Sequence, residues 1–402
     1  MTTEPDQAAG ERVDARAELT RSLREYGALA ADWAPAFDAV DRAAFLPELI
    51  WPFEHDTGAS HPVDRRTDPD GWERAAYADV PVTTQWDDGA HDGPEPGRTS
   101  TSSASMPALV ARMLTALDVF PGARVLEIGT GTGWNAGLLA ARLGDERVVT
   151  VEVDEAVAAR ARANLRAAGL HPEVVCRDGR DGWPDGAPYD RVIVTAGVRQ
   201  LPTRWLRQTR PGGVILAPWG THYGHEDALV RLTVAEDGSA SGSFLRTAGF
   251  MKLRAQRLDW ELFAHHVGDY PGEADTATTT VPLSDLGVGR PYAEKPFLLG
   301  LLMPECTHLL NTHAHDSTVW FFDRTEGSRA WASVVYRDDA EPGVATVHQS
   351  GERRLWDEVT RALAWWREQG EPPLAAFGLT VTADGTQRPW LGDPTRPVPS
   401  FR

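Results

Sequence analysis

The clearest pattern of apolar and polar positions lies in the second quarter of the chain. The apolar run Val125–Ile128 ends at glycines that alternate with threonines, and an Ala/Leu/Arg-rich segment, Asn135–Leu143, follows. This order predicts a strand, a tight turn and a helix. A second apolar run, Val148–Val151, predicts the next strand, which delivers Glu152 at its carboxyl end. The pattern therefore indicates an α/β protein.

Weaker patterns extend this prediction in both directions. Apolar residues at helical spacing predict helices at 13–26, 33–40, 107–117, 155–168 and 354–369. Short apolar or alternating runs predict strands at 173–176, 190–195, 211–219, 229–234, 242–246, 318–323, 330–336, 345–349 and 377–382. Residues 55–105, which are rich in Asp, Gly, Pro, Ser and Thr, predict a long loop, and we interpret it as a lid.

Composition limits the class of protein. The chain has 402 residues, 42% of them hydrophobic, and 15 Trp, which indicates a folded protein of two or three domains. A net charge of −18 argues against nucleic acid as a partner, because nucleic-acid binders usually present a basic surface. We find neither a secretory signal nor a long apolar span, and two cysteines are too few for a disulfide framework. We therefore expect a soluble cytoplasmic protein without membrane contact.

The spacing of the glycines suggests which nucleoside the predicted turn binds. A dinucleotide site has the pattern G-x-G-x-x-G, whereas here Glu127 precedes Gly129, Gly131 and Gly133. An acidic residue at that position would repel a phosphate but suits the ammonium and sulfonium of S-adenosylmethionine. Glu152, about 20 residues past the glycines, suits ribose hydroxyls. A glycine turn alone is also common in ordinary α/β proteins, but the strands and the two acidic residues favour a cofactor site.

Several separated motifs resemble the protein-L-isoaspartate O-methyltransferase family. They are Val125–Gly133, Arg177-Asp178-Gly179 with Gly182-Trp183-Pro184, Ala187–Asp190, Gln208 with Pro211-Gly212-Gly213, and Pro218-Trp219-Gly220. Arg42, Phe45 and Pro47 also resemble this family, with Asp41 where a proline is common. The chain continues far beyond Gly220. In this respect it resembles long actinobacterial relatives that modify ribosomally made peptides, including lanthipeptides and graspetides, and convert an aspartate into an aspartimide.

The resemblance implies a fold and a domain organisation. We expect a class I S-adenosylmethionine-dependent methyltransferase fold, a Rossmann-like doubly wound sheet, with an N-terminal helical region and an additional α+β domain. The N-terminal region would comprise residues 1–78, the methyltransferase domain 79–235 and a C-terminal substrate-recognition domain 236–402, with the boundary in the polar stretch 235–241. The N-terminal helices would cover an edge of the sheet or border the substrate entrance.

The candidate site contains one residue for the acceptor and ten for the cofactor. Ser105 lies in a Ser-x-Pro turn that the resemblance places over the methyl donor, although a serine before a proline-started helix is usually an N-cap. The resemblance assigns Asp178 and Gly179 to the adenine, and Thr195 begins a run of small residues that leaves room at the methyl group. The cofactor-binding residues are predicted to be Glu127, Gly129, Thr130, Gly131, Gly133, Glu152, Val153, Asp178, Gly179 and Thr195.

Other chemistry is less well supported. We predict no metal site, because the His308, His313, His315 and Asp316 group has no convincing ligand spacing. Cys176 is interpreted as a small buried apolar residue. The Trp356, Trp365 and Trp366 cluster is interpreted as core.

The predicted function is methylation of an Asp side chain in a ribosomally synthesised peptide, leading to aspartimide and then possible isoaspartate, with S-adenosylhomocysteine as coproduct. The partner would be a precursor peptide already cyclised by another enzyme. The alternatives are isoaspartate repair and a catalytically silent binding module with this fold. Methylation of nucleic acid is a weaker fourth, because the chain is acidic and lacks a base-clamping Asn/Asp-Pro-Pro-Tyr turn.

Overall fold

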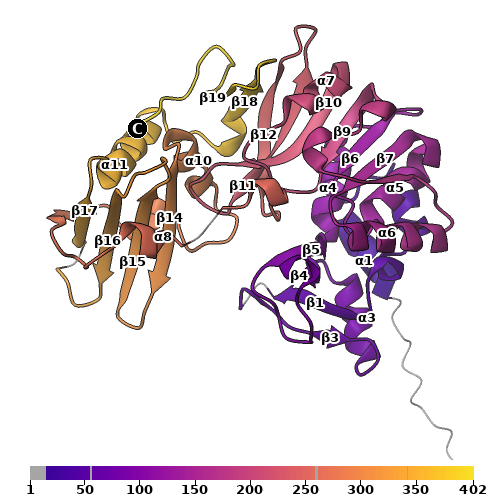
Figure 1. Ribbon diagram of the computed structural model, residues 1–402, viewed down its shortest axis with the longest axis horizontal. Coiled ribbons are helices and arrows are strands. Elements are labelled where there is room, and N and C mark those ends of the chain that lie inside the picture. The colour runs from indigo at the N-terminus through magenta and orange to yellow at the C-terminus, as the bar shows by residue number, and fades with distance from the viewer. Residues whose placement is uncertain (1–14, 55–56, 259–260, 342) are drawn as a thin grey trace, which may run out of the picture. The chain divides into compact units, whose positions relative to one another are not determined.

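The computed structural model describes residues 15–54, 57–258, 261–341 and 343–402. The chain divides into two compact units (Figure 1). The first contains residues up to Ala123 together with Thr130–Arg177, and the second contains Arg124–Gly129 together with Asp178–Arg402. The predicted start of the first helix at Val13 lies outside the described residues. No helix in the described part of the chain is both long and apolar enough to cross a membrane.

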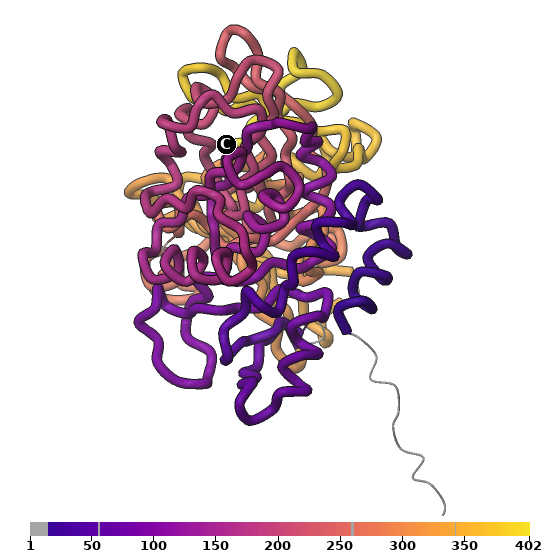
Figure 2. The backbone as a smooth tube through the Cα atoms, turned by 90° about the vertical axis from the view of Figure 1, so that its right-hand side faces the viewer, coloured from indigo at the N-terminus to yellow at the C-terminus, as the bar shows by residue number. Residues whose placement is uncertain are grey.

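The first unit begins with the two predicted helices. They are α1 (Ala15–Glu25) and α2 (Ala34–Ala39), and a short 3-10 helix, η1 (Arg42–Phe45), follows. Leu19 and Leu23 form the buried stripe of α1. Helix α1 contacts α2 and α3, in the indigo part of the backbone in Figure 2.

The long loop predicted for residues 55–105 is wrong. This region contains most of a small antiparallel sheet with the strand order β2-β1-β4-β5, in which β3 pairs with β1. The elements are β1 (Leu49–Glu54), β2 (Ala59–Ser60), β3 (Val63–Asp64), α3 (Pro69–Tyr77), β4 (Val82–Trp86), η2 (Asp87–Gly89) and β5 (Ser100–Ala104). Ile50, Trp72 and Val82 belong to the core between the sheet and α3. The strands of this sheet are short, and β5 consists almost entirely of Ser and Thr, so the composition resembles that of a loop.

The rest of the first unit agrees closely with the sequence prediction. It contains α4 (Pro107–Leu117), α5 (Trp134–Leu143), η3 (Asp145–Arg147), β7 (Val148–Glu152), α6 (Glu155–Ala167) and β8 (Glu173–Cys176). Strands β7 and β8 are parallel, with Glu152 opposite Cys176. The predicted burial of Cys176 is wrong, because β8 is exposed at both ends and Cys176 is its last residue.

The second unit contains a mixed sheet with the order β19-β18-β12-β11-β10-β9-β6. Strand β9 is parallel to β6 and β10, whereas the remaining pairs are antiparallel. The elements are β6 (Val125–Ile128), η4 (Gly179–Asp181), η5 (Pro184–Gly186), β9 (Tyr189–Val194), α7 (Thr203–Gln208), β10 (Thr209–Gly220), β11 (Asp227–Val234), β12 (Ala240–Ala248), β18 (Phe377–Val381) and β19 (Gln387–Leu391). All residues of β6 are buried, as expected for a strand covered on both faces.

The stretch predicted as a domain boundary is a hairpin turn. Ala235 donates a backbone hydrogen bond of 2.8 Å to Ser239, between β11 and β12. Strand β12 then pairs with β18, so residues near the C-terminus complete the sheet that begins with β6 (Figure 1). A cut after Ala235 would therefore remove three strands from this sheet.

A second sheet in this unit has the order β13-β17-β16-β15-β14 and is antiparallel. Its elements are η6 (Arg254–Gln256), α8 (Leu262–His266), β13 (Asp275–Thr279), α9 (Leu283–Leu286), α10 (Glu294–Leu302), β14 (Cys306–Thr312), β15 (Asp316–Asp323), β16 (Trp331–Arg337), β17 (Ala345–Ser350), α11 (Leu355–Glu368) and η7 (Leu374–Ala376). Helix α11 lies along the sheet (Figure 1) and contributes Trp356 to the core, whereas Trp365 and Trp366 are half-buried.

Candidate functional site

The glycine turn and the end of β7 are joined in the first unit by one carboxylate. The Gly131 amide donates a hydrogen bond of 3.0 Å to Glu152 Oε2. Glu152 Oε1 accepts from the amides of Val153 and Asp154, at 2.9 and 3.1 Å. Burial raises the pKa of Glu152, and these three backbone donors oppose that shift. The structure therefore brings the predicted residues Gly131, Glu152 and Val153 together.

The other residues of this turn have different surroundings. A Cβ atom at Gly131 would lie 3.3 Å from the Ser103 carbonyl oxygen, so the turn approaches the end of β5. Gly133 begins α5, and a Cβ atom there would lie 3.4 Å from Ala161, so this glycine allows helix packing. Thr130 is buried, and its hydroxyl bonds to that of Thr150 at 2.7 Å. These contacts indicate structural roles for Gly133 and Thr130.

Ser105 follows β5 and is half-buried. The N-cap of α4 is Met106, and no side chain of that residue caps the helix. Within the part of the chain that the structure describes, the Ser105 hydroxyl has no hydrogen-bond partner. The N-cap interpretation of Ser105 is therefore wrong, and its hydroxyl remains available beside the residues that approach the glycine turn.

In the second unit, Glu127 is fully buried in β6. Gly129 follows with φ +100°, and a Cβ atom there would lie 2.7 Å from Thr195 Oγ1. The Thr195 hydroxyl lies within hydrogen-bond distance of the Ile128 carbonyl, at 3.1 Å, and of the Gly129 carbonyl. Thr195 thus fixes the end of β6, and Gly129 must be a glycine because its conformation and its contact both exclude a side chain.

Asp178 and Gly179, also in the second unit, lie at the start of η4. Asp178 Oδ1 accepts from the Arg180 amide at 2.9 Å, and the Arg180 guanidinium also binds this carboxylate. A Cβ atom at Gly179 would lie 2.8 Å from Ile128, so the glycine permits close approach to β6. Arg180 is a site residue that the motifs do not predict, although a basic residue two positions after the acidic one indicates such a pair.

These residues fit a nucleoside cofactor. Gly129 and Gly131 have φ +100° and +53°, conformations in which the backbone can approach a ligand without a side chain between them. Val153, which directly follows Glu152, is 43% exposed, an apolar surface that an adenine ring could cover. The Glu152 carboxylate has lone pairs beyond those that its three backbone donors use.

The histidine group is not gathered as a metal site would require. His308 binds the Tyr223 carbonyl through Nδ1 at 2.7 Å, whereas His313 and His315 are exposed. Within the described ranges, no group of three or more His, Cys, Asp or Glu side chains could hold a metal ion.

The parallel strands, the glycine turn after β6 and the acidic residue at the end of β7 define a class I S-adenosylmethionine-dependent methyltransferase fold. A family model described as protein-L-isoaspartate(D-aspartate) O-methyltransferase matches residues 55–257, about half of the chain. The chain belongs to this family, whose methyl donor is S-adenosylmethionine.

Two curated relatives illustrate the similarity. A protein-L-isoaspartate O-methyltransferase of Methanopyrus kandleri is 43% identical over 151 residues, which are 37% of this chain and 65% of that protein. The protein of the same name from Pyrococcus horikoshii is 39% identical over 136 residues, 34% of this chain and 61% of that protein. The chain thus matches less than two thirds of the length of either relative.

A solved structure named protein-L-isoaspartate O-methyltransferase matches a larger part of the chain. The match covers 94% of this chain and 100% of that one, with a TM-score of 0.52 and 21% identity. It shows a shared fold that extends beyond the family-model match.

Proposed function

We propose that this chain is an S-adenosylmethionine-dependent carboxyl O-methyltransferase that acts on isoaspartyl residues of proteins or peptides. Family membership and the names of the relatives support this proposal. The observation that carries it is the Ser105 hydroxyl, which has no partner among the described residues and follows a strand whose Ser103 carbonyl approaches Gly131. An available hydroxyl beside the glycine turn suits an acceptor carboxylate.

The predicted residues of the glycine turn and of the strand ends would hold the cofactor. Glu152 and Gly131 would contact the ribose, Val153 would cover the adenine, and Asp178 and Gly179 would face the adenine edge. Glu127 and Gly129 would lie near the amino-acid part of the cofactor, and Thr195 would border the methyl group. Thr130 and Gly133 would act indirectly, because their contacts in the structure are with Thr150 and with helix α6.

The chemistry requires alignment more than proton transfer. Bound S-adenosylmethionine would supply an electrophilic methyl group to a carboxylate oxygen. A side-chain carboxyl has a reference pKa of about 4, so the acceptor is ionised at neutral pH without a general base. The Ser105 hydroxyl would donate a hydrogen bond to one carboxylate oxygen and leave the other directed at the methyl group. Well-oriented reactants can gain about 7–11 kcal/mol from proximity.

The proposal is tested with a synthetic peptide that contains one L-isoaspartyl residue and a matched peptide that contains Asp. Incubation of the protein with labelled S-adenosylmethionine should give one methyl ester on the isoaspartyl peptide and much less on the Asp peptide. Calorimetry should show binding of S-adenosylhomocysteine. Equal methylation of both peptides would contradict isoaspartate selectivity, and no binding of the nucleoside would contradict the cofactor.

A second candidate is methylation of an Asp in a ribosomally synthesised, cyclised peptide, followed by loss of methanol to give the aspartimide. Strand β13 favours it, because this edge strand of the C-terminal sheet is exposed along most of its length. Extended peptides commonly bind by pairing with such an edge. If this candidate holds, the precursor peptide should gain one methyl mass and then lose methanol at a single Asp, and it should be preferred over the isoaspartyl peptide.

A further inference from the structure

The N-terminal part of the chain contacts the turn that presents Ser105. We call residues 105–108, which run from the end of β5 into the first turn of α4, the Ser105 turn. Two side chains from segments far earlier in the sequence, Arg42 in η1 and Asp79 after α3, bind the backbone at its two ends. All of these residues belong to the first unit. The sequence predicted only that the N-terminal helices would cover a sheet edge or border the entrance.

Arg42 holds the beginning of the Ser105 turn. Arg42 is 2% exposed, and its guanidinium donates to the carbonyl oxygens of Ser105 at 3.3 Å and of Ala104 at 3.4 Å. The same group binds backbone carbonyls in the last turn of α3 and just after it, those of Ala76, Ala78 and Val80. Within the described ranges, no carboxylate lies at ion-pair distance from Arg42, so its hydrogen bonds go to these carbonyls, while the more distant Asp79 charge favours the protonated form. Burial lowers the pKa of Arg42 to about 10, which leaves it protonated at neutral pH.

Arg42 is itself held in place by its own segment. The Asp41 carboxylate caps η1 by accepting from the Ala43 amide at 3.1 Å. It also accepts a hydrogen bond of 2.7 Å from the Tyr77 hydroxyl, at the end of α3. The Arg42 guanidinium lies 5.7 Å from the centre of the Trp134 ring, at the start of α5. These contacts therefore hold the Arg42 guanidinium in the position from which it binds the Ser105 carbonyl.

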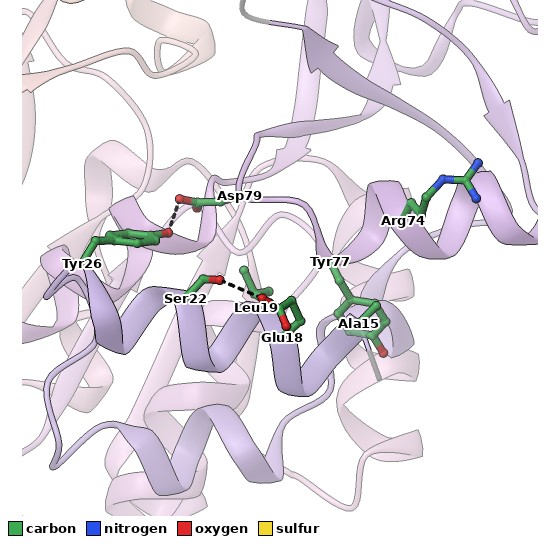
Figure 3. A pocket seen from close by; sticks show the side chains of 8 residues that line it. All are labelled: Ala15, Glu18, Leu19, Ser22, Tyr26, Arg74, Tyr77 and Asp79. Atoms are coloured by element: carbon green, nitrogen blue, oxygen red, sulfur yellow. Dashed lines mark hydrogen bonds between the residues drawn. The ribbon is translucent and has the colours of Figure 1, made fainter. Parts of the chain in front are cut away.

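Asp79 holds the other end of the Ser105 turn. Its Oδ1 accepts a hydrogen bond of 2.7 Å from the Ala108 amide, one of the free donors at the start of α4. Its Oδ2 accepts at 2.5 Å from the hydroxyl of Tyr26, which directly follows α1. Figure 3 shows this Tyr26–Asp79 bond at a pocket of about 550 Å³ that α1 and the end of α3 line. Asp79 thus takes the capping position that a serine near a helix start usually fills.

We propose that Arg42 and Asp79 form a clamp that positions Ser105 for the acceptor carboxylate. The clamp binds only backbone atoms of the Ser105 turn, so the Ser105 hydroxyl remains without a partner among the described residues. Both ends of a four-residue turn are fixed, and the direction of the hydroxyl follows from the backbone between them. This inference rests on the proposed role of Ser105, and Arg42 and Asp79 are positioning residues rather than catalytic residues.

The first experiment replaces Asp79 with Ala in the full chain. The released Ala108 amide and the loosened turn should lower kcat for the isoaspartyl peptide by about 10- to 100-fold, because a small misplacement of a reacting group can cost that much. The Kd for S-adenosylhomocysteine should change less than about threefold, because Asp79 does not contact the proposed cofactor residues. Asp79→Asn should restore most of kcat, since its amide oxygen can still accept from Ala108.

The matched control is Asp68→Ala. Asp68 caps α3 in the same unit by accepting from the Gly71 amide at 2.8 Å, and it does not bind the Ser105 turn. Both substitutions remove a helix cap, but only Asp79→Ala should lower kcat. Equal losses of kcat in both variants would show that Asp79 acts through the stability of the unit, which would overturn the clamp.

A double-mutant cycle tests whether the clamp acts through Ser105. Asp79→Ala combined with Ser105→Ala should have the same kcat as Ser105→Ala alone, because the hydroxyl to be positioned is absent. Arg42→Lys should behave in the same way, since it keeps the charge but loses the planar fork that reaches several carbonyls. Losses that multiply fully in the double variants would overturn the proposal.

Hydrogen exchange provides a measurement that does not depend on activity. The amides at the start of α4 should exchange at least about tenfold faster in Asp79→Ala and at the normal rate in Asp68→Ala. An unchanged rate in Asp79→Ala would overturn the clamp even if methylation fell. If the wild-type chain bound no S-adenosylhomocysteine and methylated neither peptide, the proposed function would fail, and the exchange rates would still decide whether Asp79 holds the turn.

Discussion

The Gly131 amide and the Glu152 carboxylate form a hydrogen bond of 3.0 Å between the glycine turn and the end of β7. The same carboxylate also accepts from the amides of Val153 and Asp154. Glu152 thus shapes the backbone on both sides of the proposed ribose position, and it has acceptor capacity left for a ribose hydroxyl. We therefore expect Glu152 to affect both the local fold and the affinity for the cofactor.

The first prediction follows from this contact. Glu152→Ala should weaken binding of S-adenosylhomocysteine about 10- to 100-fold, because hydrogen bonds to a charged group contribute about 1.5–3 kcal/mol. Titration calorimetry at neutral pH measures the change. Glu155→Ala is the matched control, since it removes an exposed carboxylate three residues away in the first turn of α6. Equal affinity of the Glu152 variant and the wild type would contradict the assignment.

The second prediction concerns Ser105. Ser105→Ala should lower kcat for the acceptor peptide at least about tenfold and leave the affinity for S-adenosylhomocysteine nearly unchanged, because the hydroxyl is proposed to bind the acceptor. Steady-state kinetics and calorimetry on the same preparation separate the two effects. Ser241→Ala serves as control, because it makes the same substitution in the second unit. The Ser241 hydroxyl bonds to that of Thr380 at 2.7 Å. A parallel loss of affinity would indicate a cofactor role for Ser105 instead.

The regular part of the fold was predictable because its signals are local. The strand, turn and helix around Gly129 have apolar runs and positive-φ glycines, and their observed bounds lie within one or two residues of the predicted ones. The family match confirms the class of fold that these residues predicted. The nearly continuous apolar runs of the strands indicate burial on both faces, and this signal can be read from the sequence alone.

The remaining features depend on contacts between distant segments. Strand β5 pairs with β4 across a polar connection, and its Ser/Thr composition does not differ from that of a loop. Nothing near Arg42 in the sequence indicates that it binds the backbone of Ser105, more than sixty positions away. The polar composition of residues 235–241 suggests a domain boundary, but the stretch forms a hairpin, and strand β18, which extends the same sheet, follows only at residue 377. Such relationships require the folded chain.

The third prediction concerns a buried ion pair in the second unit. Lys252 binds Asp227, which is fully buried in β11 and packs over Gly197. Burial raises the pKa of Asp227 to about 6, and the Lys252 ammonium opposes that shift. Lys252→Met should reduce the free energy of unfolding by about 3–5 kcal/mol, because it leaves a buried carboxylate without its partner. Urea denaturation at pH 8 measures the loss.

The double variant Lys252→Met with Asp227→Asn provides the control for this pair. It removes both charges, so it should lose less stability than the single lysine variant. The pH dependence has a definite sign. Asp227 has a raised pKa in the folded state, so protonation favours folding below that pKa, and the deficit of Lys252→Met should be larger at pH 8 than at pH 5. A deficit that does not depend on pH would contradict an unpaired carboxylate as its cause.

The last prediction concerns acid stability and His308. Its ring lies 4.6 Å from the Tyr223 ring, and Nδ1 binds the Tyr223 carbonyl at 2.7 Å. Burial lowers the pKa of His308 to about 4, although the carbonyl opposes that shift. The unfolded chain, with a histidine pKa of about 6.5, therefore binds this proton more readily than the folded chain. The contribution of His308 to stability is complete above pH 6.5 and is lost as the pH falls toward 4.

His308→Asn removes this titration while an amide hydrogen can still reach the Tyr223 carbonyl. The wild type should lose up to about 3 kcal/mol more stability than this variant between pH 7.5 and pH 4.5. Urea denaturation of both proteins at a series of pH values gives the difference, in which the carboxylates common to both cancel. His315→Asn is the matched control, because it makes the same substitution at an exposed histidine in the neighbouring part of the chain. Parallel curves for the wild type and His308→Asn would show that His308 has the same pKa in the folded and unfolded chains. That result would contradict the prediction.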